Sequence, residues 1–191
     1  MTEAFLVSTG LVALGEIGDK TQLLALLLAA RFKRPLPIVA GILVATLANH
    51  TAAGFVGGWI AAALGPDRLR WVIGLGFLAM AAWMMVPDRA DDNSQGGRQR
   101  FGVFGTTASA FFLAEMGDKT QIATVALAAR FPDLVAVVAG TTLGMLSADV
   151  PAVLLGDRAA QRVPMAWVHG IAAALFALLG VATLAGAERW L

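Results

Sequence analysis

A short polar motif interrupts an otherwise apolar run near the start of the chain, and it returns 99 positions later. It reads EIGDKTQ at residues 16–22 and EMGDKTQ at residues 115–121. Between residues 16–32 and 115–131, 11 of 17 positions are identical. Similarity at a fixed offset is typical of an internal duplication, so we interpret the two halves of the chain as repeats.

The composition places this duplication in a membrane. Hydrophobic residues make up 58% of the 191 residues, charged residues 14%, and the mean hydropathy is +0.74. A soluble domain carries about 25% charged residues. A net charge of +1 and the lack of a basic run argue against nucleic-acid binding, and the absence of cysteine excludes disulfides and thiolate ligands. The first residues lack the basic region of a signal peptide, so we expect the first apolar run to be retained.

We predict an all-α integral membrane protein with six transmembrane helices. About 20 apolar residues cross the hydrocarbon core of a bilayer, and six stretches reach that length approximately. They cover about residues 5–30, 38–64, 69–86, 103–129, 134–155 and 165–187. A polar linker at residues 87–100 separates a first three-helix repeat, 1–86, from a second, 101–191.

Three helices are an odd number, so the second repeat should enter the membrane from the opposite side and the repeats should be inverted. Inverted repeats recur in secondary transporters, where equivalent segments meet near the midplane. With the motif lysines left out, eight Lys or Arg residues fall in loops on the linker side and four on the other side. The linker should therefore be cytoplasmic, and both termini should lie outside the cytoplasm.

The ionisable motif residues are costly inside a membrane and point to function. Asp or Lys at the centre of a transmembrane helix costs roughly 2.5–3.5 kcal/mol on insertion scales. In a continuous helix, Glu16, Asp19 and Lys20 would share one face. Gly18 fits either close helix contact or a local break, as does its counterpart in the second copy. The structural alternative is that each Lys only neutralises a carboxylate of its own helix.

The two motifs together suggest a site for a divalent cation. Four carboxylates and two lysines have a formal charge of −2, which a divalent cation would neutralise. Oxygen ligands suit Mn²⁺, Ca²⁺ or Mg²⁺, and the residues do not choose among the three. The predicted metal ligands are Glu16, Asp19, Glu115 and Asp118, supported by Lys20, Thr21, Gln22, Lys119, Thr120 and Gln121.

Protons should compete with the metal for these oxygens, as an antiporter requires, because four desolvated carboxylates cannot all stay ionised without a cation. Both lysines are candidate counter-charges for the empty site. Asn49 and His50 in the second stretch and Asp149 in the fifth are candidates for a proton pathway or a gate. The alternative for His50 is a hydrogen bond to a neighbouring helix. We expect His169, close to the end of a span, to be interfacial.

Two copies of Glu-x-Gly-Asp-Lys-Thr, three apolar stretches apiece and a polar central linker resemble the Gdt-type family of cation/proton antiporters. This family includes Golgi manganese and calcium transporters and bacterial manganese exporters. The resemblance implies a bacterial inner-membrane exporter of Mn²⁺ or Ca²⁺ in exchange for protons, without enzymatic activity or a cofactor. It also implies that the four motif carboxylates form the cation site.

Two other functions compete with this one. The same frame could export a small organic cation or an amino acid, but such substrates usually need some apolar lining. A membrane-embedded hydrolase would need a nucleophile such as Ser109 or Ser147, and neither stands in a recognisable Ser/His arrangement. A hydrolase function would also leave the duplication of the charged motif unexplained.

Overall fold

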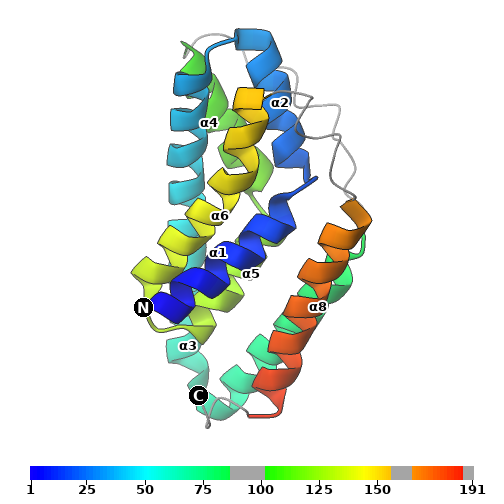
Figure 1. Cartoon of the computed structure of the whole chain (residues 1–191). Helices are drawn as coiled ribbons and strands as arrows, with labels where there is room; N and C mark the ends of the chain where they lie inside the picture. Colours follow the sequence, from blue (N-terminus) through cyan, green and yellow to red (C-terminus); the bar gives the residue numbers. More distant parts are fainter. Residues whose placement is uncertain (87–101, 156–164, 187–191) are drawn as a thin grey trace.

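A computed structural model describes residues 1–86, 102–155 and 165–186, and every regular element in these ranges is a helix (Figure 1). The helices are α1 (Thr2–Glu16), α2 (Lys20–Phe32), α3 (Pro35–Met84), α4 (Gly102–Glu115), α5 (Lys119–Arg130), α6 (Leu134–Leu155) and α8 (Met165–Leu184). The predicted linker at 87–100, the loop at 156–164 and the last five residues lie outside the described residues. The all-α prediction is therefore confirmed for the described ranges.

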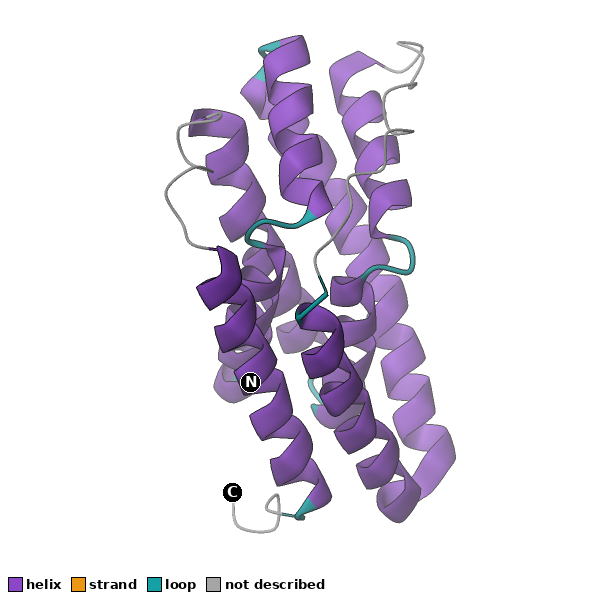
Figure 2. Cartoon of the chain, turned by 90° about the vertical axis from the view of Figure 1, so that its right-hand side faces the viewer, coloured by secondary structure: helices purple, strands orange, loops and turns teal. Residues whose placement is uncertain are grey.

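The first and fourth apolar stretches are broken helices rather than continuous ones. α1 ends at Glu16 and α2 begins at Lys20, while α4 ends at Glu115 and α5 begins at Lys119. Figure 2 shows these interruptions as loops part-way along the molecule. The single helical face predicted for Glu16, Asp19 and Lys20 is thus wrong, because Asp19 has an extended backbone outside either helix.

The second and third stretches form one long element with a sharp bend. α3 has a single non-helical residue, Gly65, with φ of 68° and ψ of 166°. A short turn with Pro66, Asp67, Arg68 and Arg70 is predicted between these stretches, but the structure turns at Gly65 and those four residues are helical. Within the described residues, three helical segments are long and apolar enough to cross a membrane, namely Pro35–Gly65, Leu134–Leu155 and Trp167–Leu184. The motif breaks leave α1, α2, α4 and α5 individually too short for that test.

The two halves of the chain interlock through glycines 99 positions apart. Gly140 of α6 lies against α1, where an added Cβ would come 2.6 Å from the Phe5 carbonyl oxygen and 3.0 Å from the Ser8 Cβ. Gly41 of α3 lies against α4, where the corresponding atoms are the Phe104 carbonyl oxygen at 2.9 Å and the Thr107 Cβ at 2.8 Å. Phe104 and Thr107 are the counterparts of Phe5 and Ser8 in the second half. Each motif helix therefore packs on a helix of the other half, and Figure 1 shows α1 beside α6.

Residues at equivalent positions of the two halves also touch each other. The Thr46 hydroxyl donates a hydrogen bond to the sulfur of Met145 at 3.2 Å. The ring centroids of Phe77 and Phe176 are 6.1 Å apart, and both rings are completely buried. Both pairs are separated by 99 positions, which is the contact pattern expected where two related halves face each other.

Candidate metal centre

The first helix break is built by the residues of the motif itself. Ile17 has φ of −65° and ψ of 114°, and Gly18 has φ of 84°, the values of a type II turn with glycine in its left-handed position. The Asp19 N–H closes the turn on the Glu16 carbonyl oxygen at 3.1 Å. The Gln22 side-chain oxygen accepts the Gly18 N–H at 3.0 Å. The backbone groups released by the break are thus partly satisfied within the motif.

The second helix break repeats this geometry. Gly117 has φ of 77°, the Asp118 N–H donates to the Glu115 carbonyl oxygen at 3.1 Å, and Gln121 accepts the Gly117 N–H at 2.7 Å. Asp19 and Asp118 occupy the N-cap positions of α2 and α5, with ψ of 166° and 168°. Neither aspartate makes the side-chain capping hydrogen bond. The break therefore aims a carboxylate at the middle of the molecule from the positive end of a helix.

A threonine one residue after the lysine holds each motif glutamate. The Thr21 hydroxyl donates to Glu16 Oε2 at 2.7 Å, and the Thr120 hydroxyl donates to Glu115 Oε2 at 3.1 Å. Both glutamates are completely buried, and the second carboxylate oxygen of each has no hydrogen-bond partner among the described residues. Each glutamate thus presents one oxygen that is desolvated and unsatisfied in the protein alone.

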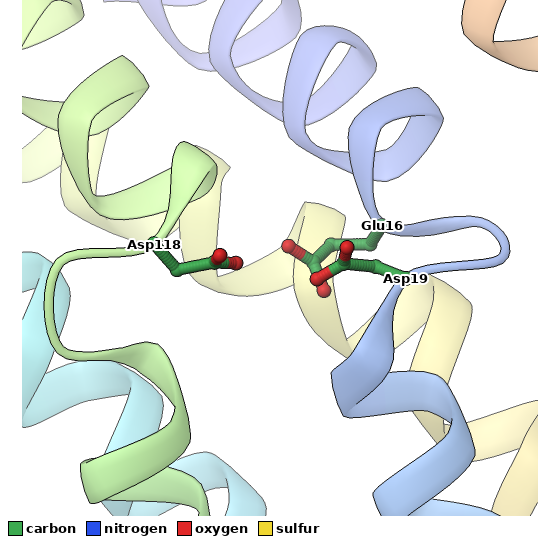
Figure 3. A group of neighbouring side chains, drawn as sticks. All are labelled: Glu16, Asp19 and Asp118. Carbon is green, nitrogen blue, oxygen red and sulfur yellow. The ribbon is translucent and has the colours of Figure 1, made fainter. Parts of the chain in front are cut away.

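Three of the four predicted ligands converge from the two breaks. One carboxylate oxygen each from Glu16, Asp19 and Asp118 lies within 4.8 Å of the other two, and Figure 3 shows Asp118 facing the other pair. Their exposures are 0%, 3% and 5%. Oxygens this close repel strongly in a dry interior, so a cation would stabilise the group.

The fourth predicted ligand stands apart from this group. Glu115 is not among the three converging carboxylates. It is close enough to Asp118, Asp149 and Asp19 to be repelled by each of them. The structure therefore brings together three of the four motif carboxylates and places the fourth nearby.

The two motif lysines have different partners. The Lys20 ammonium forms a salt bridge with Asp118 Oδ1 at 2.9 Å, joining the first motif to the second. The Lys119 ammonium donates to the carbonyl oxygen of Val86, just beyond the end of α3, at 3.1 Å. The structural alternative, in which each lysine neutralises only its own motif, does not describe Lys20.

The secondary candidates lie close to the motifs. Asp149 of α6 is completely buried, and it lies close enough to Glu16 and Glu115 to repel both. Neither of its carboxylate oxygens has a hydrogen-bond partner in the part of the chain that the structure describes. Asn49 of α3 donates to the Phe112 carbonyl oxygen of α4 at 3.1 Å. His50 is completely buried, and within the described ranges neither ring nitrogen has a hydrogen-bond partner, so no hydrogen bond joins it to Asp149.

Sequence reasoning missed two contacts that support the first break. The His169 Nε2 atom of α8 lies 3.3 Å from the carbonyl oxygen of Ile17, so this histidine contacts the motif as well as standing near a helix end. The Gln22 amide donates to the Ala148 carbonyl oxygen of α6 at 3.1 Å. No local sequence signal connects residues so far apart. The one indirect indication is that Ala148 directly precedes Asp149, which is a candidate from the sequence alone.

The sequence profile described as divalent cation/proton antiporter GDT1 matches residues 4–92 and 103–190, one segment in each half of the chain. The chain belongs to the GDT1 family. Both matched segments contain a complete copy of the motif. The predicted membership and the assignment to membrane cation transport are thereby confirmed, and a family of antiporters indicates a transporter rather than an enzyme.

Three GDT1 relatives illustrate the range of similarity. The chain is 48% identical over 178 residues to a Vibrio cholerae protein named "Putative manganese exporter", covering 93% of this chain and 88% of that one. It is 30% identical to a GDT1-like protein of Synechocystis sp., covering 95% of this chain and 96% of the other. It is 29% identical to a chloroplastic GDT1-like protein of Oryza sativa, covering 95% and 61%. No solved structure matches the chain.

Proposed function

We propose that this GDT1 protein exports Mn²⁺ from the cytoplasm in exchange for protons, with Ca²⁺ as the second candidate substrate. The observation that carries the proposal is the convergence of Glu16, Asp19 and Asp118, whose oxygens lie within 4.8 Å of one another. Two broken helices, one from each half, supply them. Ion sites formed at discontinuous helices are a recurring device of secondary transporters.

The ligand chemistry supports a hard divalent cation. The three converging carboxylates carry a formal charge of −3 when ionised, and Mn²⁺ or Ca²⁺ would neutralise most of it. Carboxylate oxygens suit both ions, and the chain has no cysteine to favour a softer metal. The name of the Vibrio relative supports Mn²⁺ as the first substrate to test.

Proton coupling follows from competition for the same oxygens. Without a cation, a buried cluster of carboxylates lowers its energy by taking up protons, and an entering cation displaces them. In this scheme Glu115 and Asp149 surround the cation ligands and share the protons of the empty site. Their burial and their mutual repulsion support this assignment. His50 and Asn49 stay candidates for a gate or proton pathway on the α3 side.

The proposed architecture has six passes arranged as two inverted repeats. It is supported by the doubled motif, by the matched packing of Gly41 and Gly140, and by the contacts of Thr46 with Met145 and Phe77 with Phe176. Two motifs related in this way would present carboxylates to one shared site. The family profile, which matches each half once, supports the same reading.

The proposed orientation puts both termini outside the cytoplasm, in the inner membrane of a bacterium. It is supported by the eight-to-four distribution of loop Lys and Arg residues. A topology reporter fused at Gln95 should be cytoplasmic, and one fused after Leu191 should not. Reporters on the same side would contradict the three passes of the second repeat.

The function is tested with everted membrane vesicles, whose interior is acidic and corresponds to the outside of the cell. Addition of Mn²⁺ should dissipate the pH gradient and load the vesicles with manganese, because protons leave as the cation enters. Ca²⁺, Mg²⁺, organic cations and amino acids are assayed in parallel. If neither Mn²⁺ nor Ca²⁺ changes the pH gradient in vesicles with the wild-type protein, the proposal is wrong. If only an organic cation or an amino acid is taken up, export of that organic solute replaces it.

A further inference from the structure

The two motif lysines occupy equivalent sequence positions but different environments. Lys20 is 29% exposed, and its ammonium is 2.9 Å from Asp118 Oδ1. Lys119 is 3% exposed, and its ammonium donates to the Val86 carbonyl oxygen at 3.1 Å. The local backbone is the same around both, so the difference comes from what each side chain meets across the molecule.

Lys20 lies where a bound cation has to act. Its partner Asp118 is one of the three converging carboxylates, and its charge also acts on Asp19 and Glu115. A cation held by this group and an ammonium on the same aspartate would stand only a few ångströms apart. At that separation the repulsion of like charges is large even in a partly solvated site. The ammonium and the cation should therefore not occupy the group together.

The side chain of Lys20 is also suited to move away from Asp118 when a cation binds. It carries its charge on a flexible four-carbon stem, and its partial exposure gives it a direction in which to move. The almost completely buried Lys119 instead connects the first residue of α5 to the segment that follows α3. Cations near the carboxyl end of a helix interact favourably with its last carbonyls, as in a structural tie.

We propose that Lys20 is a built-in competitor of the transported cation, occupying its place on Asp118 when the site is empty, while Lys119, through its hydrogen bond to Val86, ties α5 to the end of α3. This assignment rests on the proposed function, and it separates two lysines that the sequence treats alike. It makes the return of the empty transporter depend on Lys20, because without the ammonium Asp118 would lose the ion pair that neutralises it.

The proposal predicts opposite effects on binding and on transport. Lys20→Met should bind Mn²⁺ about tenfold more tightly or better, because no ion pair has to be broken, a change equivalent to about 1.4 kcal/mol. The same variant should exchange Mn²⁺ for protons more slowly than wild type, because the empty site returns less readily. A substitution that only damaged the structure would weaken binding and transport together.

The experiment measures Mn²⁺ binding by calorimetry on the full-length protein in detergent, and exchange in vesicles, for wild type, Lys20→Met, Lys20→Arg and Lys119→Met. Lys20→Arg keeps a cation able to pair with Asp118, so it should not tighten binding. Lys119→Met is the matched control for loss of one positive charge, and it should not tighten binding either. If Lys20→Met misfolds, amine labelling of the wild type replaces it, since Mn²⁺ should increase modification of Lys20 and leave Lys119 unchanged.

The outcomes separate this inference from the proposed function. Unchanged or weaker Mn²⁺ binding by folded Lys20→Met, equal tightening by Lys119→Met, or Lys20 labelling that Mn²⁺ does not increase would overturn the competitor role while leaving the cation site intact. Absence of Mn²⁺ and Ca²⁺ binding by the wild-type protein would instead remove the proposed function itself. Tight binding with slow exchange in Lys20→Met alone is the result that supports the proposal.

Discussion

The two motif breaks have the same local structure and different tertiary partners. In both, glycine turns the chain at positive φ, threonine holds the glutamate and glutamine accepts the glycine N–H. The partners differ, because Glu16 joins the converging carboxylates and Glu115 does not. Lys20 reaches Asp118 of the opposite motif, whereas Lys119 donates to Val86. A duplicated sequence can therefore encode one backbone device twice while the assembled protein gives each copy its own task.

The difference also concerns how each break is supported from outside. At the first break, His169 contacts the Ile17 carbonyl oxygen, and the Gln22 amide donates a hydrogen bond to α6. The second break is tied through Lys119 to the segment after α3.

The largest effect is expected from removing either converging aspartate. Asp19→Asn and Asp118→Asn should each reduce metal/proton exchange to background, because each loses a charge and a strong ligand with little change in volume. The measurement is Mn²⁺-driven loss of the pH gradient in vesicles, with the amount of inserted protein as the control. Near-wild-type exchange by either variant would show that the two breaks do not share one site.

A smaller effect is expected from replacing the glutamates, and it should differ between the two breaks. Glu16→Gln should weaken Mn²⁺ binding at least about tenfold, whereas Glu115→Gln should weaken it less, because only Glu16 belongs to the converging group. Wild-type affinity should fall as the pH is lowered from about 8 to 6, since more protons must be displaced. Either substitution should flatten that slope, and calorimetry in buffers of different ionisation enthalpy measures the protons released. Equal losses for the two variants would contradict the inequality of the breaks.

The glycines test whether the breaks are locally equivalent. Gly18→Ala and Gly117→Ala should each destabilise the protein by about 1–2 kcal/mol, because both glycines have positive φ. Around Gly117 there is room for a Cβ, so the cost there is conformational. Gly58→Ala in α3, also with open space, should be neutral or stabilising. Thermal unfolding in detergent gives the comparison, and unequal losses at the two breaks would show that tertiary strain contributes.

The smallest effect should come from the glutamines. Gln22→Ala and Gln121→Ala each remove the acceptor for a glycine N–H, but only Gln22 also donates to Ala148 of α6. Each hydrogen bond contributes about 0.5–1.5 kcal/mol, so Gln22→Ala should be the more destabilising of the two by roughly that amount. The same unfolding assay measures the difference. A larger loss of stability for Gln121→Ala than for Gln22→Ala would contradict the inference that the first break has the additional support.

The sequence by itself determined the class of protein, most of the helices and the chemistry of the site. Apolar length predicted α6 at 134–155, with the bounds that the structure has. The doubled motif predicted a cation site and the family. The break at each motif was open from sequence, since glycine in an apolar run fits both a close contact and a turn, and only the positive φ of Gly18 and Gly117 decided it.

Only the tertiary structure decided which side chains meet. The convergence of Glu16 and Asp19 with Asp118, the pairing of Lys20 across the motifs and the contact of His169 with Ile17 join residues about 100 or more positions apart. The physical reason is that the local sequence fixes φ and ψ through nearest neighbours, whereas these pairs depend on how α1 packs on α6 and α4 on α3. Equivalent motifs give equivalent turns, and α1 packs on α6 as α4 packs on α3. The unequal partners come from contacts that are not repeated, such as His169 at the first break and Val86 at the second.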